Sequence, residues 1–208
     1  IPHAQLIQGK ELSYNNINDA DSAFQLIKEF NPNDPTVAII KHANPCGVAS
    51  GNSLLDAYEK ALSCDSTSAF GGIIALNQKI DESTATKIIE IFTEVIIAPE
   101  ITEEAKNIFK NKNNLRVLII NEMNLKNNNK DFKSIEGGLL VQSRDDKITN
   151  KNDLNIVTKT QPTEDQISDL LFAFKVCKHV KSNAIIYVKN KKTIGIGAGQ
   201  MSRIDSAK

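Results

Sequence analysis

Short runs of aliphatic residues alternate along the chain with segments whose apolar residues recur every three or four positions. The runs are typical of buried strands, because they are rich in Val and Ile and end at Gly, Pro or polar residues. They cover residues 36–42, 71–76, 94–99, 115–120, 136–142, 183–190 and 193–200.

Helices are predicted between most of these strands. Ser53 can cap a helix with apolar residues at Leu54, Leu55, Tyr58 and Leu62, a spacing that places them on one face. The segments 81–92, 102–112 and 163–180 also have helical patterns. Strands separated by helices of about ten residues predict βαβ units, and therefore an α/β fold with a mostly parallel or mixed sheet covered on both faces.

Two polar stretches interrupt this alternation. Asn121 to Lys133 is rich in Asn and Lys and is predicted to be a loop. Arg144 to Thr160 is also polar, and we expect it to connect two parts of the molecule.

The composition of the chain argues against nucleic acid and membranes as binding partners. Of 208 residues, 25 are basic and 25 acidic, so the chain lacks the field that attracts nucleic acid or an anionic membrane. No apolar run approaches the roughly 18 residues that span a bilayer. Three cysteines without C-x-x-C spacing, together with the lack of a signal pattern, indicate reduced thiols and a cytoplasmic protein. The chain begins at Ile1 and ends in "SRIDSAK", and we expect it to be part of a longer protein.

The stretch "IIKHANPCGV" carries the strongest candidate chemistry. A buried strand delivers Lys41 and His42 at its C-terminal end, before a turn predicted over residues 44–47, and ligands of open α/β sheets bind at such ends. The neighbouring ammonium disfavours an imidazolium, so His42 is expected to be neutral and able to accept a proton. Lys41 could stabilise developing negative charge. The alternative is a strand that simply ends in solvent.

A zinc site is not expected here. Zinc nucleotide deaminases have H-x-E followed by P-C-x-x-C, whereas "HAN" follows this pattern poorly and Cys46 is followed by Gly, Val and Ala. Cys46 could pair with His42 as a nucleophile, or it could be a small buried thiol.

Glycine-rich segments suggest ligand contacts, each with a structural alternative. In "SAFGGIIA", Phe70 could stack on a planar ring and Gly71 could let the backbone approach a ligand, although the pattern by itself favours a tight turn with a core phenylalanine. "GIGAGQMSR" fails the dinucleotide fingerprint, because Gln200 stands where the third glycine is required. Its glycine-rich turn could still hold an anion, and Arg203 offers a fork for a carboxylate.

Two further polar residues stand at the beginning of strands. Asn183 could orient a carbonyl group, or it could be an ordinary turn residue. Glu94 could contact a ligand, or it could be a solvated acid.

Seven segments in this order are more specific than any one of them, and together they resemble the transformylase region of the bifunctional purine biosynthesis enzymes. They are "GKELSYNNI", "IIKHANPCGVA", "DSTSAFGGIIA", "EVIIAP", "EGGLLVQ", "VKSNAIIY" and "IGIGAGQMSRIDSA". The resemblance covers essentially the whole chain. It implies cytidine-deaminase-like α/β/α lobes without zinc, with a first lobe at residues 1–155. Residues 156–208 would then be the linking helix and the first part of a second, truncated lobe.

The resemblance implies formyl transfer from 10-formyltetrahydrofolate to the 5-amino group of 5-aminoimidazole-4-carboxamide ribonucleotide (AICAR). It implies that Lys41 is the main acid–base and charge-stabilising group, that His42 binds AICAR and helps to remove the proton, and that Asn183 contacts the nucleotide near the formyl group. The other implied AICAR-binding residues are Asn16, Phe70, Gly71 and Glu94, and the implied folate-binding residues are Arg203 and Ile204.

The resemblance also implies parts that this sequence lacks. An arginine-tyrosine-glycine segment that holds the nucleotide phosphate and an IMP cyclohydrolase domain are expected upstream of Ile1, and further contacts beyond Lys208. The family's site is built across a homodimer. We therefore expect the chain alone to bind AICAR poorly and not to turn over. The alternatives are a nucleotide- or folate-binding module without catalysis and, less favoured, a nucleotide deaminase.

Overall fold

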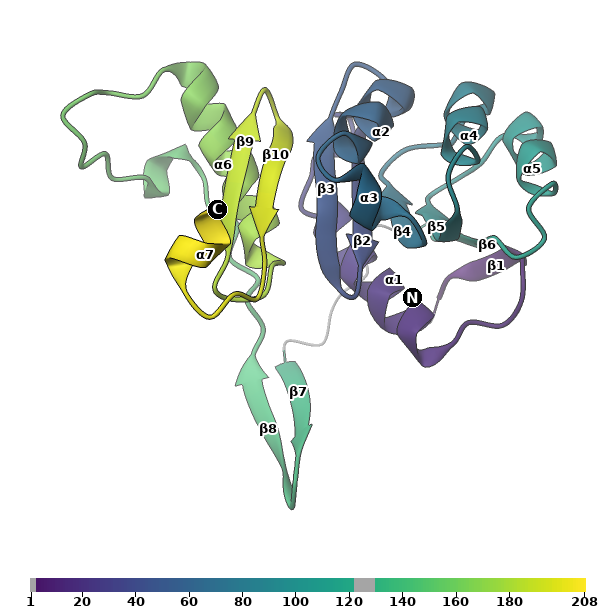
Figure 1. The fold of residues 1–208 in the computed structure, drawn as a ribbon, viewed down its shortest axis with the longest axis horizontal. Helices are drawn as coiled ribbons and strands as arrows, with labels where there is room; N and C mark the ends of the chain where they lie inside the picture. The colour runs from purple at the N-terminus through teal and green to yellow at the C-terminus, as the bar shows by residue number, and fades with distance from the viewer. Residues whose placement is uncertain (1–2, 122–129) are drawn as a thin grey trace.

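The computed structural model describes residues 3–121 and 130–208, which form an eight-stranded sheet with helices on both faces and a separate hairpin (Figure 1). The spatial order of the strands is β1 (Gln5–Gln8), β6 (Arg116–Ile119), β5 (Thr93–Ala98), β4 (Gly72–Leu76), β2 (Thr36–Lys41), β3 (Asn44–Ser50), β10 (Lys192–Gly197) and β9 (Ile185–Lys189). The helices are α1 (Tyr14–Ile27), α2 (Leu54–Leu62), α3 (Ser66–Ala69), α4 (Glu82–Ile88), α5 (Glu103–Phe109), α6 (Glu164–Lys178) and α7 (Arg203–Ala207).

The predicted α/β class with a mixed sheet is confirmed. Strands β4, β5 and β6 are parallel to one another, whereas β2 is antiparallel to both of its neighbours, β3 and β4. The parallel part of the sheet is therefore confined to the predicted βαβ units, and the strand that delivers Lys41 belongs to an antiparallel hairpin.

Two apolar layers explain why the central strands are continuous aliphatic runs. Val37 and Ile39 of β2 face the cluster that contains α2, α4 and α5, while Ala38 and Ile40 face the cluster that contains α1 and α6. Because helices cover both faces, alternate residues of one strand are buried in opposite layers.

Strands β9 and β10 join the sheet at the β3 edge. The buried Thr193 hydroxyl accepts a hydrogen bond from the Val48 N–H (2.9 Å) and donates one to the Val48 carbonyl (3.1 Å). The Ser50 N–H donates to the Lys191 carbonyl (2.9 Å). The division between residues 155 and 156 stays a prediction.

The region around residue 130 differs from the predicted loop. Residues 122–129 of that loop lie outside the described residues, and Lys130 to Lys133 belong to strand β7 (Lys130–Ile135). Among the described residues, this strand pairs with β8 alone (Gly138–Ser143), which contains most of the predicted strand 136–142. Figure 1 shows the β7–β8 hairpin extending away from the rest of the molecule. The polar connection that follows contains one short 3₁₀ helix, η1 (Lys151–Asp153).

Candidate functional site

The Lys41–His42 pair lies at a tight hairpin turn that the sequence pattern misplaced. Strand β2 ends at Lys41, His42 and Ala43 have positive φ angles of 52° and 57°, and strand β3 begins at Asn44. Two central residues with positive φ are typical of the type I′ turn, which matches the twist of hairpin strands. The turn predicted over residues 44–47 is wrong, because these residues already belong to β3, which pairs with β2.

The sequence "NPCG" looks like a turn but fits this strand for two physical reasons. The register between β2 and β3 shifts at Pro45, which places the proline at an irregularity of the ladder, where a missing N–H is tolerated. A Cβ atom at Gly47 would lie 1.9 Å from the Ala61 carbonyl oxygen of α2. Gly47 therefore permits close packing between β3 and α2.

Hydrogen bonds fix the backbone of the turn and the Lys41 side chain. The Lys41 Nζ donates to the Phe70 carbonyl oxygen at 2.6 Å. The His42 N–H donates to Asp19 Oδ2 at 2.9 Å, and the His42 carbonyl accepts from Asn44 Nδ2 at 3.1 Å. The His42 side chain is exposed and Lys41 is half-buried. Lys41 is therefore held through its side chain, whereas His42 is held through its backbone and its side chain faces solvent.

Lys41 and His42 line one cleft of about 600 Å³. Its other walls come from α3 and the residue before it, from β9 and β10, from the loop after β10 and from α7. Besides the pair they include Asn44, Cys46, Asp65, Ser68, Tyr187, Gly195, Gln200 and Asp205. The glycine-rich segment that failed the dinucleotide test thus faces the Lys41–His42 turn.

A second group of predicted residues, Asn16, Phe70, Gly71 and Glu94, does not line this cleft, and among them Phe70 contacts Lys41 through its carbonyl oxygen. Asn16 Nδ2 donates to Glu94 Oε2 at 2.7 Å, which joins α1 to β5. Gly71 has a φ angle of 73°, and its N–H donates to the Phe92 carbonyl at 2.7 Å. Because the Phe70 carbonyl accepts a hydrogen bond from Lys41, the segment that precedes β4 is directly linked to the His42–Ala43 turn.

Phe70 is exposed rather than buried in the core. The residue is 59% exposed, and its ring contacts the Phe92 ring at a centroid distance of 5.5 Å. The alternative of a core phenylalanine is therefore wrong, and the ring is available to a planar ligand.

Asn183, Arg203 and Ile204 form a third group around α7. Asn183 Nδ2 donates to the carbonyls of Gln200 (3.1 Å) and Met201 (3.0 Å), which leaves its Oδ1 as the group that could meet a ligand. Arg203 and Ile204 are exposed in the first turn of α7. None of these three residues lines the 600 Å³ cleft, although Gln200 and Asp205, on either side of Arg203 and Ile204, do.

Cys46 is a buried thiol. It is 8% exposed, and burial, assisted by the nearby Asp65 carboxylate, raises its pKa to about 11. A thiol with such a pKa is almost entirely protonated at neutral pH, so Cys46 is a poor nucleophile. Among residues 3–121 and 130–208, no three His, Cys, Asp or Glu side chains gather closely enough to hold a metal ion. In the same residues, no helix combines the length and the apolar character needed to cross a membrane.

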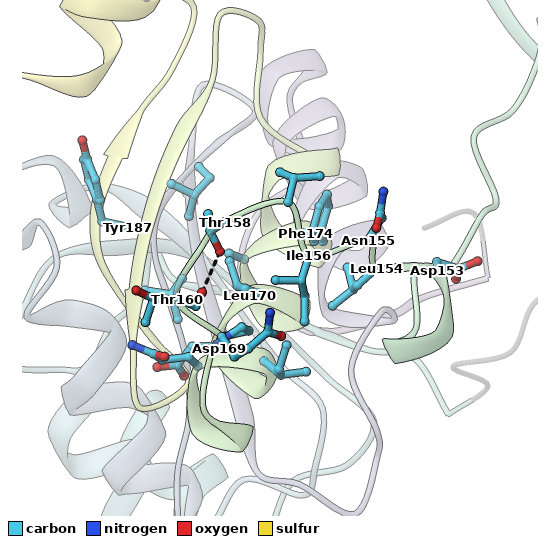
Figure 2. Close-up of a pocket in the computed structure, with 18 of the residues that line it drawn as sticks. Asp153, Leu154, Asn155, Ile156, Thr158, Thr160, Asp169, Leu170, Phe174 and Tyr187 are labelled. Carbon is cyan, nitrogen blue, oxygen red and sulfur yellow. Dashed lines mark hydrogen bonds between the residues drawn. The ribbon is translucent and has the colours of Figure 1, made fainter.

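A larger groove of about 1000 Å³ lies between α6, β9 and the extended chain after η1 (Figure 2). Figure 2 shows Leu154, Ile156, Leu170 and Phe174 lining it. The groove contains none of the residues predicted to bind or react, and its lining is mainly apolar. We therefore place the candidate site at the smaller cleft, where the polar groups converge.

Sequence patterns missed two residues that touch the turn, Asp19 and Asn44. Asp19 lies in α1, and no motif connects it with His42, 23 positions later. Asn44 was assigned to the turn itself. A side chain that bonds to a backbone N–H or C=O group places almost no requirement on the type of the partner residue, so the sequence does not indicate such a contact.

Comparison with known proteins places this chain in a family. A family model described as "AICARFT/IMPCHase bienzyme" matches residues 1–208. The "Bifunctional purine biosynthesis protein PurH" of Parvibaculum lavamentivorans is 60% identical over 210 residues, covering 100% of this chain and 39% of that protein. The protein of the same name from Bartonella bacilliformis is 59% identical over 207 residues, covering 99% and 38%. The chain thus spans about two fifths of the length of these curated relatives.

Proposed function

Because the chain belongs to the AICARFT/IMPCHase bienzyme family, we propose that it carries the Lys41–His42 part of an AICAR transformylase site. The observation that supports this most directly is the turn itself. It presents an ammonium and an imidazole from adjacent residues to one cleft, at a position where the backbone is held on both sides.

The reaction moves a formyl group from N10 of 10-formyltetrahydrofolate to the 5-amino group of AICAR. The amine nitrogen attacks the formyl carbon, the carbonyl oxygen becomes an oxyanion, and the bond from that carbon to N10 then breaks. The amine loses one proton and N10 gains one, so the exchange needs no oxidant, reductant or water. The amine is a weak nucleophile, because its lone pair is delocalised into the ring and the carboxamide.

This chemistry needs a base near the amine and a cation near the oxygen. His42 is exposed in the cleft, where a neutral imidazole would accept the amine proton. Lys41 has three N–H donors, and its hydrogen bond to the Phe70 carbonyl leaves donors for the oxyanion and for proton transfer to N10.

The other predicted residues would bind the two substrates. Asn16 bonds to Glu94, and Phe70, which is followed by Gly71, accepts a hydrogen bond from Lys41; these four residues would hold the purine precursor. Asn183 would contact the nucleotide near the formyl group through its Oδ1. Arg203 and Ile204 would hold the folate, with the guanidinium facing a carboxylate.

The larger assembly is part of the proposal. We assign residues 1–155 to a first deaminase-like lobe and residues 156–208 to the start of a second one, in a cytoplasmic homodimeric enzyme that also has IMP cyclohydrolase activity. The free cysteines are compatible with a reducing compartment. A nucleotide deaminase is less well supported, because Cys46 has no second cysteine three positions later and is buried and protonated.

The deciding experiment replaces Lys41 with Ala. Residues 1–208 would be placed in the P. lavamentivorans relative in exchange for the matching region, and formyl transfer would be followed with AICAR and 10-formyltetrahydrofolate. We expect the Lys41→Ala variant to lose on the order of 10²-fold or more in kcat, as for loss of a group that combines acid–base and electrostatic roles. Lys79→Ala, which removes an exposed ammonium paired with Glu100, is the matched control.

Two results would contradict the proposal. A chimaera that binds AICAR but never transfers the formyl group would favour the non-catalytic binding module. A Lys41→Ala variant as active as Lys79→Ala would remove Lys41 from the mechanism.

A further inference from the structure

Two hairpin turns in this molecule share one unusual backbone conformation. His42 and Ala43 have φ angles of 52° and 57°, and Asn190 and Lys191, between β9 and β10, have φ angles of 53° and 53°. Asn adopts positive φ readily, and His does so less often, whereas Ala has only a methyl group, which causes the steric conflict and cannot form a hydrogen bond to offset it. The turn at the proposed site is therefore the one whose sequence is less suited to its conformation.

In both turns an aspartate from a helix bonds to the backbone N–H groups. Asp169 of α6 accepts from Asn190 N (2.8 Å) and Lys191 N (2.7 Å). Asp19 of α1 accepts from His42 N at 2.9 Å. Each turn is thus attached to the helix that packs beside its strands.

The His42 turn has an additional attachment through Asn44. Asn44 Nδ2 donates to the His42 carbonyl (3.1 Å), and Asn44 Oδ1 accepts from the Lys181 N–H (3.2 Å). Lys181 in turn accepts at its carbonyl from Gly199 N (2.8 Å). Asn44 therefore connects the turn with the segment that carries Asn183 and with the glycine-rich loop across the cleft.

From these contacts we propose that Asp19 and Asn44 are positioning residues for formyl transfer, a role that rests on the proposed function. Asp19 bonds to the N–H of His42, and Asn44 bonds to the His42 carbonyl. Through its bond to the Lys181 N–H, Asn44 also fixes the distance between the turn and the segment that carries Asn183. Neither side chain needs to touch a substrate. Together they keep the turn in its left-handed conformation, so that the ammonium of Lys41 and the imidazole of His42 reach the same substrate.

A positioning role has a defined kinetic signature. If the turn relaxes, the two reacting side chains move relative to each other, and a displacement of about 1 Å can cost on the order of 10²-fold in rate. Loss of alignment acts on the transition state, so kcat should fall more than KM rises. Substrate binding by Asn16, Glu94 and Arg203 does not depend on the turn and should persist.

The test uses the chimaera described above, with variants at Asp19. We expect Asp19→Ala to lower kcat by on the order of 10- to 10²-fold. Asp19→Asn keeps an oxygen acceptor for the His42 N–H and should be closer to wild type than to Asp19→Ala. Asn44→Ala should lower kcat in the same way, because it removes both of the Asn44 hydrogen bonds.

A second substitution in the turn separates positioning from a merely structural role. Gly adopts positive φ without steric cost, so Ala43→Gly should restore part of the kcat lost in Asp19→Ala. A general loss of stability would not be repaired in this way. Two matched controls, Asp169→Ala at the other turn and Asp21→Ala on the same helix, should leave kcat within about twofold of wild type, since neither carboxylate contacts the His42 turn.

The Lys41 and Asp19 variants together distinguish failure of the positioning role from failure of the proposed function. If Lys41→Ala has no effect, the proposed function fails first. If Lys41→Ala abolishes transfer but Asp19→Ala behaves like Asp21→Ala, only the positioning role is overturned. An Asp19→Ala defect that Asp19→Asn and Ala43→Gly both leave unchanged would overturn it as well.

Discussion

The His42–Ala43 and Asn190–Lys191 turns have nearly the same backbone, but they relate differently to their sequences. "KNKK" is a turn-prone sequence, so the turn between β9 and β10 agrees with its local chemistry. "KHAN" is not, and its two central residues, His42 and Ala43, adopt positive φ at a cost of about 1 kcal/mol or more each. Local sequence and fold agree where the turn only connects strands, and they disagree where the turn presents Lys41 and His42. Such disagreement is expected at functional sites.

The two hairpins also differ in how firmly a helix is packed against them. A Cβ atom at Gly47 in β3 would lie 1.9 Å from the Ala61 carbonyl of α2, and one at Gly197 in β10 would lie 1.9 Å from the Ser206 carbonyl of α7. Helix α2 is part of the core, whereas α7 has five residues and packs mainly on β9 and β10. A Cβ atom at Gly47 would therefore clash with a helix of the core, whereas one at Gly197 would clash with a short peripheral helix.

The largest expected effect is that of Gly47→Ala. Because neither β3 nor α2 can withdraw, we expect the free energy of unfolding to fall by about 3 kcal/mol or more, measured by urea denaturation of the 208-residue chain. Gly197→Ala is the comparison and should cost clearly less, since α7 can shift. Equal losses for the two variants would show that the first hairpin is not packed more rigidly than the second.

The helices that carry Asp19 and Asp169 are themselves joined near their C-terminal ends. Glu29 Oε1 accepts from Lys178 Nζ (2.8 Å) and lies 3.1 Å from His179 Nε2. The three side chains are 13%, 15% and 16% exposed. Burial alone would raise the pKa of the Glu29 carboxyl, but hydrogen bonds from His179 and Lys178 together hold it below its ordinary value of 4.5.

Glu29→Gln should have an intermediate effect that depends on pH. A lowered pKa in the folded state means that the carboxylate stabilises the fold at pH values above 4.5, and that this contribution is lost as the pH falls below 4.5. At pH 7 we expect a loss of about 2 kcal/mol, because the half-buried Lys178 ammonium would lose its partner. Urea denaturation at pH 7 and pH 3.5 measures this. The two proteins should approach each other at the lower pH, and a constant difference would contradict the role of the charge.

Sequence patterns predicted most of the fold because the buried strands and capped helices have strong periodicity. They predicted no element before Thr36, since the first half of α1, with "YNNINDAD", is polar and buries only Asn16 and Ala20. They also missed β3, because a strand that contains Asn-Pro-Cys-Gly depends on a ladder irregularity and on α2 packing against Gly47. Both failures are cases in which tertiary contacts override local preference.

The candidate site was predictable only in part. Lys41 and His42 stand out because charged residues directly follow a buried run. Their link to Phe70 through a backbone carbonyl was not predictable, because any residue at position 70 offers the same oxygen. The same applies to Asp19 and Asn44, whose partners at His42 are backbone groups.

The smallest expected effect compares glycine at the two turns. Ala43→Gly removes the steric cost of a left-handed alanine, about 1 to 2 kcal/mol, but glycine also gains about 0.5 to 1 kcal/mol of conformational entropy in the unfolded chain. The net result should be a stabilisation of about 0.5 kcal/mol. Asn190→Gly has the same entropic cost and little steric relief, because Asn already tolerates positive φ, so it should be neutral or slightly destabilising. Parallel urea denaturation curves of the two variants measure the difference, which should be positive for the His42 turn. If both variants change stability equally, the two turns store the same strain. The positive φ angles at the proposed site would then cost no more free energy than those at the other turn.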